Sequence, residues 1–438
     1  MRTAKDSFWL DTLYEPGPAI RGEHDADVAI IGGGFTGIAA AYFIKQRFPK
    51  KRVIVLESEY VGFGSTGRNS GGVSGIMAHN YLNLKKKFGI EKGAQLSRFI
   101  AQGVPIVEEL IEKYSIDCDY VRTGRMVFAE TERQVKLLEE EKKAADVFGA
   151  NVDWLGREEA RSRFGARNVL AAVRHPHEGT GNPAKFVRGM KRVVESLGVE
   201  VYEYSRCTHV ETGQTMVLYT PLGQVRAQNI VVATNAYSNP LGLLRYKVLP
   251  FYMYQIVTEP LTKAQWDELH MPGRDNTFLA KNLYWAVRPT LDNRVLFGEC
   301  KVLYFYDAER DYSYCPSEYM RYYNLLIEKF PFLQGIKITH EWGGRLGITL
   351  DFLPKIGLTG KHENIYYALG YNGSGWAPSQ VLGKMLAALM AGEKSELTEN
   401  VLINKPALGV PSALIMYLGV KGLLALYKTY DRMLEVGK

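Results

Sequence analysis

Short apolar runs followed by long helical patterns recur along the chain. The runs at 28–31, 53–56, 230–232 and 365–369 have the length and composition of buried strands. The first and the last of these runs lead through glycines into long apolar helical patterns. Strand, glycine turn and helix in this order predict an α/β, Rossmann-like domain.

The segments between these runs carry other patterns. Helical periodicity at 95–114 and 130–149 flanks a strand-like stretch at 120–130, and Asn182-Pro183 is typical of the start of a further helix. From 246 to 342, aromatic and β-branched stretches alternate with turns, which predicts an antiparallel sheet. The expected organisation is therefore two interleaved domains. The first comprises 1–90, 180–240 and 338–405, the second comprises 91–179 and 241–337, and 406–438 forms a C-terminal apolar and basic helical segment.

The glycines after the first strand have G-x-G-x-x-G spacing. Gly32 permits a tight turn, Gly34 permits close approach of a pyrophosphate, and Gly37 permits close packing of the helix on the strand. The helix N-terminus then faces the phosphates. Glu57 ends the second strand, 20 residues after Gly37 (57 − 37), where a carboxylate accepts hydrogen bonds from ribose and repels a 2′-phosphate. Read alone, the motif also fits a packing loop without a ligand.

Two further glycine-rich segments accompany this loop. The stretch 60–75, YVGFGSTGRNSGGVSG, offers donors and small residues for a long flat ligand, although a surface loop is the alternative. The stretch 365–376 ends in Gly370, Gly373 and Gly375 before an apolar helix, although an ordinary strand-to-helix turn has the same form.

Composition narrows the class of protein. The 438 residues are 46% hydrophobic, and 54 basic against 47 acidic residues leave a net charge of +7. The basic residues are scattered among acidic ones, so nucleic acid is not an expected partner. Cys118, Cys207, Cys300 and Cys315 have no C-x-x-C spacing, which favours a reducing cytoplasm. The N-terminal residues lack the apolar core of a secretory signal, and the loop cluster of His175, His177 and Glu178 is too sparse for an expected metal site.

Five segments in register carry a family resemblance: ADVAIIGGGFTGIAAAYFI, LESEYVGFGSTGRNSGG, IVVATNAYS, EWGGRLGITLDFLPKIG and YYALGYNGSGWAPSQVLGKMLA. Together they resemble the FAD-dependent amine and amino-acid oxidoreductases of the D-amino-acid oxidase superfamily, and within it the bacterial γ-glutamylputrescine oxidase group. The resemblance implies an FAD-binding first domain and an α+β substrate domain built on the antiparallel sheet.

The resemblance also implies cofactor contacts. It places Ala233, Thr234 and Asn235 beside FAD, and the backbone around Thr208 at the adenine. The segment 65–72 would lie by the isoalloxazine, and 373–376 by its O2/N1 edge. The residues so assigned are Gly32, Gly34, Phe35, Thr36, Gly37, Glu57, Ser58, Ser65, Thr66, Arg68, Asn69, Ser70, Gly71, Gly72, Thr208, Ala233, Thr234, Asn235, Arg345, Gly370, Tyr371, Asn372, Gly373, Ser374, Gly375 and Trp376. We expect non-covalent FAD, with Cys300 and His79 as the remaining candidates for attachment.

Candidate substrate residues come from the predicted sheet. Tyr252, Tyr254, Tyr284 and Trp285 can form aromatic walls, and strand alternation places Tyr252 and Tyr254 on one face; core packing is the alternative for each.

Other candidates come from single positions. Arg345 can bind a carboxylate or the flavin, or hold a loop, and Glu299 can attract an ammonium group or lie on the surface. Ser374 stands where the resembling group often carries histidine. Leu296 stands where monomeric sarcosine oxidases carry a lysine that assists oxygen reduction, so fast reaction with oxygen is not expected.

The predicted function is oxidation of a C–N bond in an amine or amino acid by hydride transfer to FAD, giving an imine that hydrolyses. The acceptor is oxygen or quinone, and the alternatives are a quinone-linked dehydrogenase and a non-catalytic flavoprotein that serves a partner protein. Residues 413–427 are almost wholly apolar, so 411–438 is a candidate for peripheral membrane contact at the inner face of the membrane, or for packing on the protein.

Overall fold

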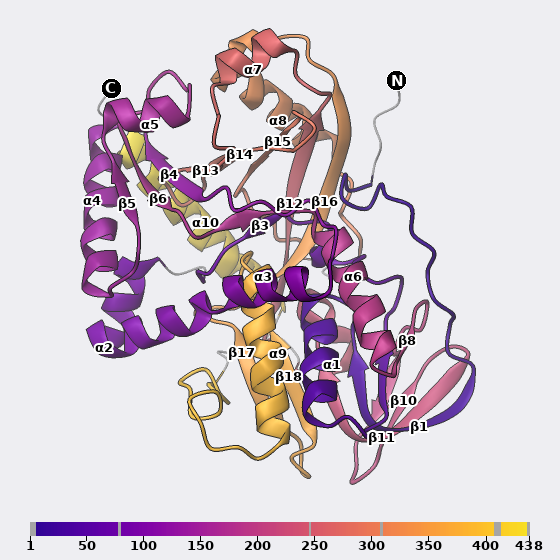
Figure 1. Cartoon of the computed structure of the whole chain (residues 1–438). Coiled ribbons are helices and arrows are strands. Elements are labelled where there is room, and N and C mark those ends of the chain that lie inside the picture. The colour runs from indigo at the N-terminus through magenta and orange to yellow at the C-terminus, as the bar shows by residue number, and fades with distance from the viewer. Residues whose placement is uncertain (1–5, 78–79, 245–246, 307–309, 407–412, 436–438) are drawn as a thin grey trace.

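The computed structural model describes residues 6–77, 80–244, 247–306, 310–406 and 413–435. Over these residues the chain builds two eight-stranded sheets and one two-stranded ladder of β3 (Gly72–Val73) and β7 (Gly179–Thr180). Figure 1 shows the two large sheets at opposite ends of the molecule.

The first sheet is the nucleotide-binding type expected from the sequence. Its main path is β17 (Lys355–Thr359), β18 (Ile365–Leu369), β11 (Gly223–Val232), β1 (Gly22–Ile31), β2 (Val53–Leu56) and β8 (Val199–Tyr202), with β10 (Met216–Tyr219) and β9 (His209–Glu211) attached to β11. The ladders from β18 to β8 are parallel, and β17 and β10 join antiparallel. The carboxyl ends of β1, β2, β11 and β18 therefore meet at one edge.

Helices cover one face of this sheet, and the β9–β10 hairpin covers the other. The covering helices are α1 (Phe35–Arg47), α9 (Trp376–Met390) and α6 (Pro183–Ser196), and α3 (Gly103–Lys113) packs on α9. Alternate residues of β1 divide between the two layers: Val28 and Ile30 pack with the helices, whereas Ala29 and Ile31 pack toward the hairpin. Burial on both faces explains why these strands are continuously apolar.

The second sheet is the one expected in the substrate domain. Its order is β16 (Ile338–Ile348), β12 (Leu249–Thr258), β15 (Val295–Glu299), β14 (Trp285–Pro289), β13 (Asn276–Leu279), β4 (Arg125–Ala129), β6 (Ala171–His175) and β5 (Asp153–Leu155). All its ladders are antiparallel except β13 with β4. Strand β16 pairs along β12, so 338–348 belongs to this sheet, although the predicted division begins the last FAD-domain segment at 338.

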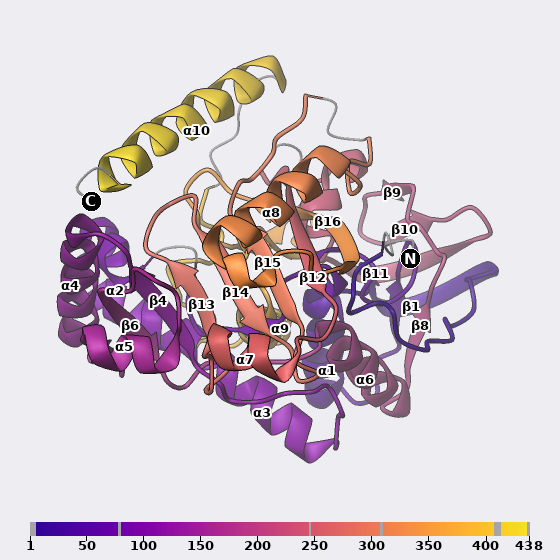
Figure 2. The same ribbon diagram turned by 90° about the horizontal axis from the view of Figure 1, so that it is seen from above.

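One face of the second sheet is packed with hydrophobic side chains under α5 (Arg157–Arg163), α7 (Lys263–Leu269) and α8 (Pro316–Lys329). Figure 2 shows α8 lying over these strands. The opposite face of the sheet is therefore the one left to form a site.

Three helices complete the molecule. The helix expected at 95–114 is two helices, α2 (Tyr81–Ala101) and α3, and α4 (Glu132–Val147) packs against α2. Helix α10 (Ala413–Glu435) stands apart from the other helices in Figure 2. None of the described helices is long and apolar enough to cross a membrane.

Candidate cofactor and active site

A cavity of about 1690 Å³ lies between the two sheets. It runs from the carboxyl ends of β1, β2, β11 and β18 to the free face of the second sheet, and α10 forms part of its wall. The molecule thus brings segments from the whole length of the chain to one concave surface, as ligand sites in α/β folds commonly do.

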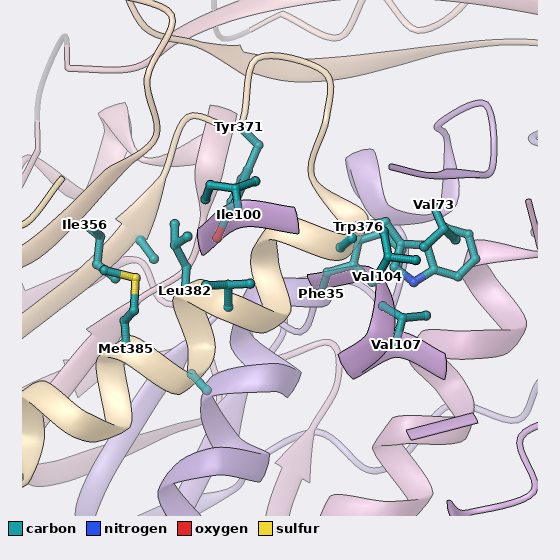
Figure 3. Close-up of a cluster of buried hydrophobic side chains, with 14 of the residues drawn as sticks. Phe35, Val73, Ile100, Val104, Val107, Ile356, Tyr371, Trp376, Leu382 and Met385 are labelled. Atoms are coloured by element: carbon teal, nitrogen blue, oxygen red, sulfur yellow. The ribbon is translucent and has the colours of Figure 1, made fainter. Parts of the chain in front are cut away.

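Two helix N-termini open into this cavity side by side. Phe35 begins α1 and Trp376 begins α9, and their rings stack with centroids 5.1 Å apart (Figure 3). Gly34 and Gly375 occupy the N-cap positions, so neither helix has a side-chain cap. The cavity therefore receives the positive ends of two helix dipoles, which favour a ligand carrying negative charge.

The first glycine loop is as tight as its spacing predicts. A Cβ on Gly37 would lie well under 3.0 Å from the carbonyl oxygen of Gly32, so the helix packs on the strand only with glycine there. A Cβ on Gly34 would meet Thr66 Oγ1 at 2.8 Å, and the same oxygen accepts a hydrogen bond from Phe35 N at 3.1 Å. The second glycine-rich segment is thereby fixed on the first.

Glu57 closes the end of β2. Its Oε2 accepts a hydrogen bond from Gly33 N at 2.6 Å, and its Oε1 accepts from Glu59 N at 3.0 Å and from Ser58 Oγ at 3.1 Å. Burial raises the pKa of this carboxyl group above its ordinary value. The side chain thus shapes the loop and lines the cavity at the same point.

Many polar groups of the second glycine-rich segment, 60–75, form hydrogen bonds within the segment itself. Asn69 donates to Thr66 O at 2.6 Å and accepts from Gly71 N at 2.7 Å. Arg288 lies behind the segment and donates to Ser70 O at 2.6 Å, in space that a Cβ on Gly71 would fill. Burial lowers the pKa of Arg288 to about 9. The segment is therefore a rigid wall and not a surface loop.

The end of β11 is tied to the third segment. Asn235 Oδ1 accepts a hydrogen bond from Gly370 N at 2.9 Å, and Asn372 Oδ1 accepts from Thr349 N at 2.8 Å. The Ala-Thr-Asn sequence after β11 thus joins the ends of β11, β16 and β18 while lining the cavity.

Most residues predicted to bind the cofactor line this cavity. They are Gly32, Gly34, Phe35, Thr36, Glu57, Ser58, Ser65, Thr66, Arg68, Asn69, Ser70, Gly72, Ala233, Thr234, Asn235, Arg345, Tyr371, Asn372, Gly373, Ser374, Gly375 and Trp376. Gly37, Gly71 and Gly370 pack behind the lining. Thr208 is exposed, bonds to Tyr219 O and does not line the cavity, whereas its neighbours Arg206 and Cys207 do; the backbone contact of this region to the adenine stays a prediction.

The predicted aromatic walls lie on the wrong face of the sheet. Tyr252 and Tyr254 do share a face, but both are buried in the core under α8, and so is Trp285. The cavity is lined by the alternate residues of β12, namely Phe251, Met253 and Gln255. Of the four predicted aromatic residues, Tyr284 alone lines it, because it precedes β14 on the face opposite to Trp285.

The remaining candidates differ in their surroundings. Arg345 lines the cavity, but its Nε donates to Tyr252 Oη at 2.9 Å and its Nη2 to Arg310 O at 3.1 Å. Glu299 pairs with Arg321 and does not line the cavity. Leu296 is buried, and Cys300 lines the cavity, where burial raises its thiol pKa to about 11. His79 lies outside the described residues.

Sequence reasoning missed the far end of the cavity. Arg125, Tyr81, Phe278 and His175 gather there from β4, α2, β13 and β6. The expectation that His175 sits in an ordinary loop is wrong, since it ends β6 and stacks on Tyr81 with centroids 5.9 Å apart. Burial lowers its pKa to about 3, so it is neutral. Alternation along 120–130 was the signal available for Arg125.

Comparison with known proteins identifies the family. Residues 27–389 match the model of the FAD dependent oxidoreductase family. The chain belongs to this family. Two of its relatives in this FAD-dependent group are a probable oxidoreductase OrdL of Haemophilus influenzae, 32% identical over 90% of this chain and 89% of that protein, and the gamma-glutamylputrescine oxidoreductase of Escherichia coli, 30% identical over 87% of each.

Solved structures show the same fold. L-proline dehydrogenase from P. horikoshii superimposes with a TM-score of 0.73 at 19% identity, covering 86% of this chain and 96% of its own. Glycine oxidase from Geobacillus kaustophilus gives 0.72 at 22% identity, covering 88% and 100%. The predicted superfamily, its α/β fold, FAD as cofactor and the class of oxidoreductases acting on amines and amino acids are confirmed. Non-covalent attachment stays a prediction.

The cavity of this FAD-dependent oxidoreductase fits the cofactor. The uncapped N-termini of α1 and α9 suit the pyrophosphate and the electron-rich edge of the ring. A Cβ on Gly32, Gly34 or Gly72 would lie less than 3.0 Å from a neighbouring atom of the protein. Only glycine therefore fits at these three positions of the cavity wall. Glu57 lines the same cavity, and its contact with the ribose stays a prediction.

Proposed function

We propose that this protein oxidises the C–N bond of an amine or amino acid substrate, and that the second sheet presents the substrate to FAD. The supporting observation is that one cavity joins the dinucleotide loops to the face of β12, β13 and β4. Bound FAD would supply the hydride acceptor, and the imine product would hydrolyse in water. The protein has to orient the carbon that bears the nitrogen and to exclude water.

The residues that line the cavity on the second sheet are suited to orienting a substrate and excluding water. Phe251, Met253 and Phe278 give the cavity apolar walls, and Gln255 Oε1 is buried without a partner among the described residues. A buried amide oxygen without a donor favours a ligand that brings one, such as an amine N–H. No acid–base group of the protein is needed for hydride transfer itself.

Mixing the yellow protein anaerobically with a panel of amines and amino acids tests the function. Substrates should bleach the flavin absorbance, and a panel that leaves it unchanged would favour the non-catalytic alternative. The hydride leaves the carbon while the lone pair of the free-base nitrogen forms the C=N bond. The reduction rate should therefore rise about tenfold per pH unit below the pKa of the substrate amine, ~10.4 for a simple alkylamine. His175 and Cys300 have pKa values of about 3 and about 11, so neither should shape the profile near neutrality. A rate independent of pH would contradict the mechanism.

We also propose that the electron acceptor is a membrane quinone and that α10 docks on the inner face of the membrane. Leu296 is buried and stands where the resembling monomeric sarcosine oxidases carry a lysine that assists oxygen reduction, so another acceptor is favoured. Helix α10 supports membrane contact by exposed apolar side chains that do not line the cavity: Leu414, Ile415 and Leu418. Lys421, Lys428 and Arg432 accompany them and suit anionic lipid headgroups.

The opposite side of α10 belongs to the protein. Met416 and Val420 pack on Phe251, and Asp431 accepts hydrogen bonds from Asn282 N and Leu283 N at 3.0 and 2.7 Å. The two readings of the segment, packing and membrane contact, are thus compatible on two faces of one helix. Deleting the helix would open the cavity, so point changes on its outer face are the better test.

Replacing both Leu414 and Leu418 with glutamate should lower binding to vesicles containing anionic lipid roughly tenfold or more, because two apolar anchors become charged. These side chains are 55% and 60% exposed and do not line the cavity, so flavin content and substrate-driven bleaching should not change. Vesicle sedimentation measures the binding, with Leu222→Glu, a 50% exposed leucine on the first domain, as the control. Wild-type protein that stays in the supernatant would refute membrane docking.

A further inference from the structure

Three consecutive carbonyl groups of the second glycine-rich segment are held from behind by buried side-chain donors. The hydrogen bonds run from Trp342 Nε1 to Arg68 O at 3.0 Å, from Trp9 Nε1 to Asn69 O at 2.7 Å and from Arg288 Nη1 to Ser70 O at 2.6 Å. The three donor side chains are buried and do not line the cavity, whereas the three residues that accept from them do. These carbonyl groups therefore point away from the cavity.

The N–H groups of Asn69 and Ser70 point the opposite way, toward the cavity. In a planar trans peptide group the N–H is directed opposite to the C=O, and these N–H groups share peptide units with the carbonyls bonded to Trp342 and Trp9. Neither N–H has an acceptor among the described residues, whereas the next one along, Gly71 N, donates to Asn69 Oδ1 at 2.7 Å. The wall thus presents two adjacent backbone donors to the ligand that the cavity holds.

This part of the wall lies where the two sheets meet. On one side, Thr66 Oγ1 accepts a hydrogen bond from Phe35 N at the start of α1, at 3.1 Å. On the other side, Ser65 Oγ donates to Arg345 O on β16. The segment therefore joins the helix suited to the pyrophosphate to the sheet proposed to present the substrate, and the hydride-accepting ring of FAD has to lie between these two.

Trp9 belongs to an N-terminal strap, residues 7–20, which precedes the part of the chain matched to the family model. Further along the strap, Tyr14 Oη and Gly17 N both donate to the buried carboxylate of Glu203. The ring of Trp9 also lies against the guanidinium of Arg288, whose Cζ is 4.8 Å from the ring centroid. The strap is therefore anchored at both ends, and two of the three donors behind the wall are in contact with each other.

We propose that the N-terminal strap, through Trp9, fixes the two N–H donors of the wall against the FAD ring and thereby raises the reduction potential of the bound flavin. Trp9 is a positioning residue, because it acts through the peptide group that joins Asn69 to Ser70. Two-electron reduction makes the ring more electron-rich, so donors that are already in place stabilise the reduced form more than the oxidised form. The positive charge of Arg288 behind the same peptide groups acts in the same direction.

Trp9→Phe tests this role, because phenylalanine keeps an aromatic ring beside Arg288 but has no donor for Asn69 O. The freed peptide group holds its N–H less firmly, so the equilibrium constant for two-electron reduction of bound FAD should fall about three- to tenfold. That loss corresponds to a midpoint potential lower by ~15–30 mV. Chemical reduction of the FAD-loaded protein in the presence of reference dyes measures the potential, at saturating FAD so that weaker binding does not interfere.

Two further variants complete the experiment. Trp342→Phe removes the donor to Arg68 O and should lower the potential in the same way. Trp266→Phe is the matched control, because this indole packs on Arg274 and does not line the cavity. Its potential should equal that of the wild-type protein.

The potential separates positioning from support of the fold. If Trp9 only supported the fold, Trp9→Phe would weaken the binding of oxidised and reduced FAD equally and leave the potential unchanged, and that result would overturn the proposal, as would a higher potential. If Trp9→Phe does not fold, Trp342→Phe decides, and an unchanged potential there overturns the assignment. The measurement uses a chemical reductant, so failure of the proposed amine oxidation would not affect it.

Discussion

Replacing Gly37 with alanine should leave the protein without FAD and lower its free energy of unfolding by about 3 kcal/mol or more. The new Cβ would overlap the carbonyl oxygen of Gly32, which is backbone and has no side-chain freedom to move away. Gly32 itself has a φ of 108° and is hemmed in by the carbonyl of Ala233, so the turn cannot yield on that side either. Helix α1 would be pushed off β1, and the N-terminus that faces the cavity would move with it.

Flavin absorbance per polypeptide and a thermal melt measure the two effects. Gly422→Ala is the matched control, because Gly422 also lies within a helix but has open space around it. There alanine should raise stability by about 0.5–1 kcal/mol and leave the colour unchanged. A yellow Gly37→Ala protein with an unchanged melting temperature would show that the loop is looser than this packing indicates.

The first sheet was predictable because its signals are local. Strand, glycine turn and helix follow one another within about thirty residues at both 28–47 and 365–390, and each unit carries its own reason for glycine. The return of distant segments to one sheet is not a local property. The resemblance to a known family predicted which distant segments pair in one sheet. The strand sequences alone do not specify these pairings.

The face of a strand turned toward the site was not predictable. In β12, alternation groups Tyr252 with Tyr254 and Phe251 with Met253, but both groups are apolar and both become buried. One side packs under α8 and the other lines the cavity, so hydrophobicity cannot tell them apart. The choice depends on where α8, 60 residues later, comes to rest.

Arg125 and α10 were hidden for related reasons. The sequence around an arginine at the start of a short strand does not show whether that arginine forms an ion pair. The structure shows that Arg125 forms none among the described residues. The apolar run of α10 predicted a buried or membrane-bound helix but not that Val420 and Leu424 would line the cavity. The sequence shows the chemical character of such residues, but their role depends on contacts between segments that are far apart in the chain.

Replacing Glu57 with alanine should weaken FAD binding by about 1–3 kcal/mol, or roughly 5- to 150-fold in Kd. The carboxylate accepts hydrogen bonds from Gly33 N and Glu59 N at the end of β2, so its loss loosens this loop. It also removes the predicted acceptors for the ribose hydroxyls. Glu57→Gln keeps the side-chain volume and one acceptor oxygen, but its NH2 group faces one of the backbone N–H donors. Its affinity for FAD should therefore lie between those of wild type and Glu57→Ala.

Calorimetric titration of the apoprotein with FAD measures these affinities, with Glu200→Ala as the control, since Glu200 pairs with Arg52 at 2.7 Å and does not line the cavity.

The pH dependence adds a sharper test. Burial raises the pKa of Glu57, so the side chain takes up a proton at a higher pH than an ordinary carboxylate and loses its strength as an acceptor there. Wild-type affinity for FAD should therefore fall on mild acidification, whereas the affinity of Glu57→Ala should stay nearly constant. Equal pH profiles for the two proteins would show that the ribose is held by other groups and that Glu57 acts through the loop alone.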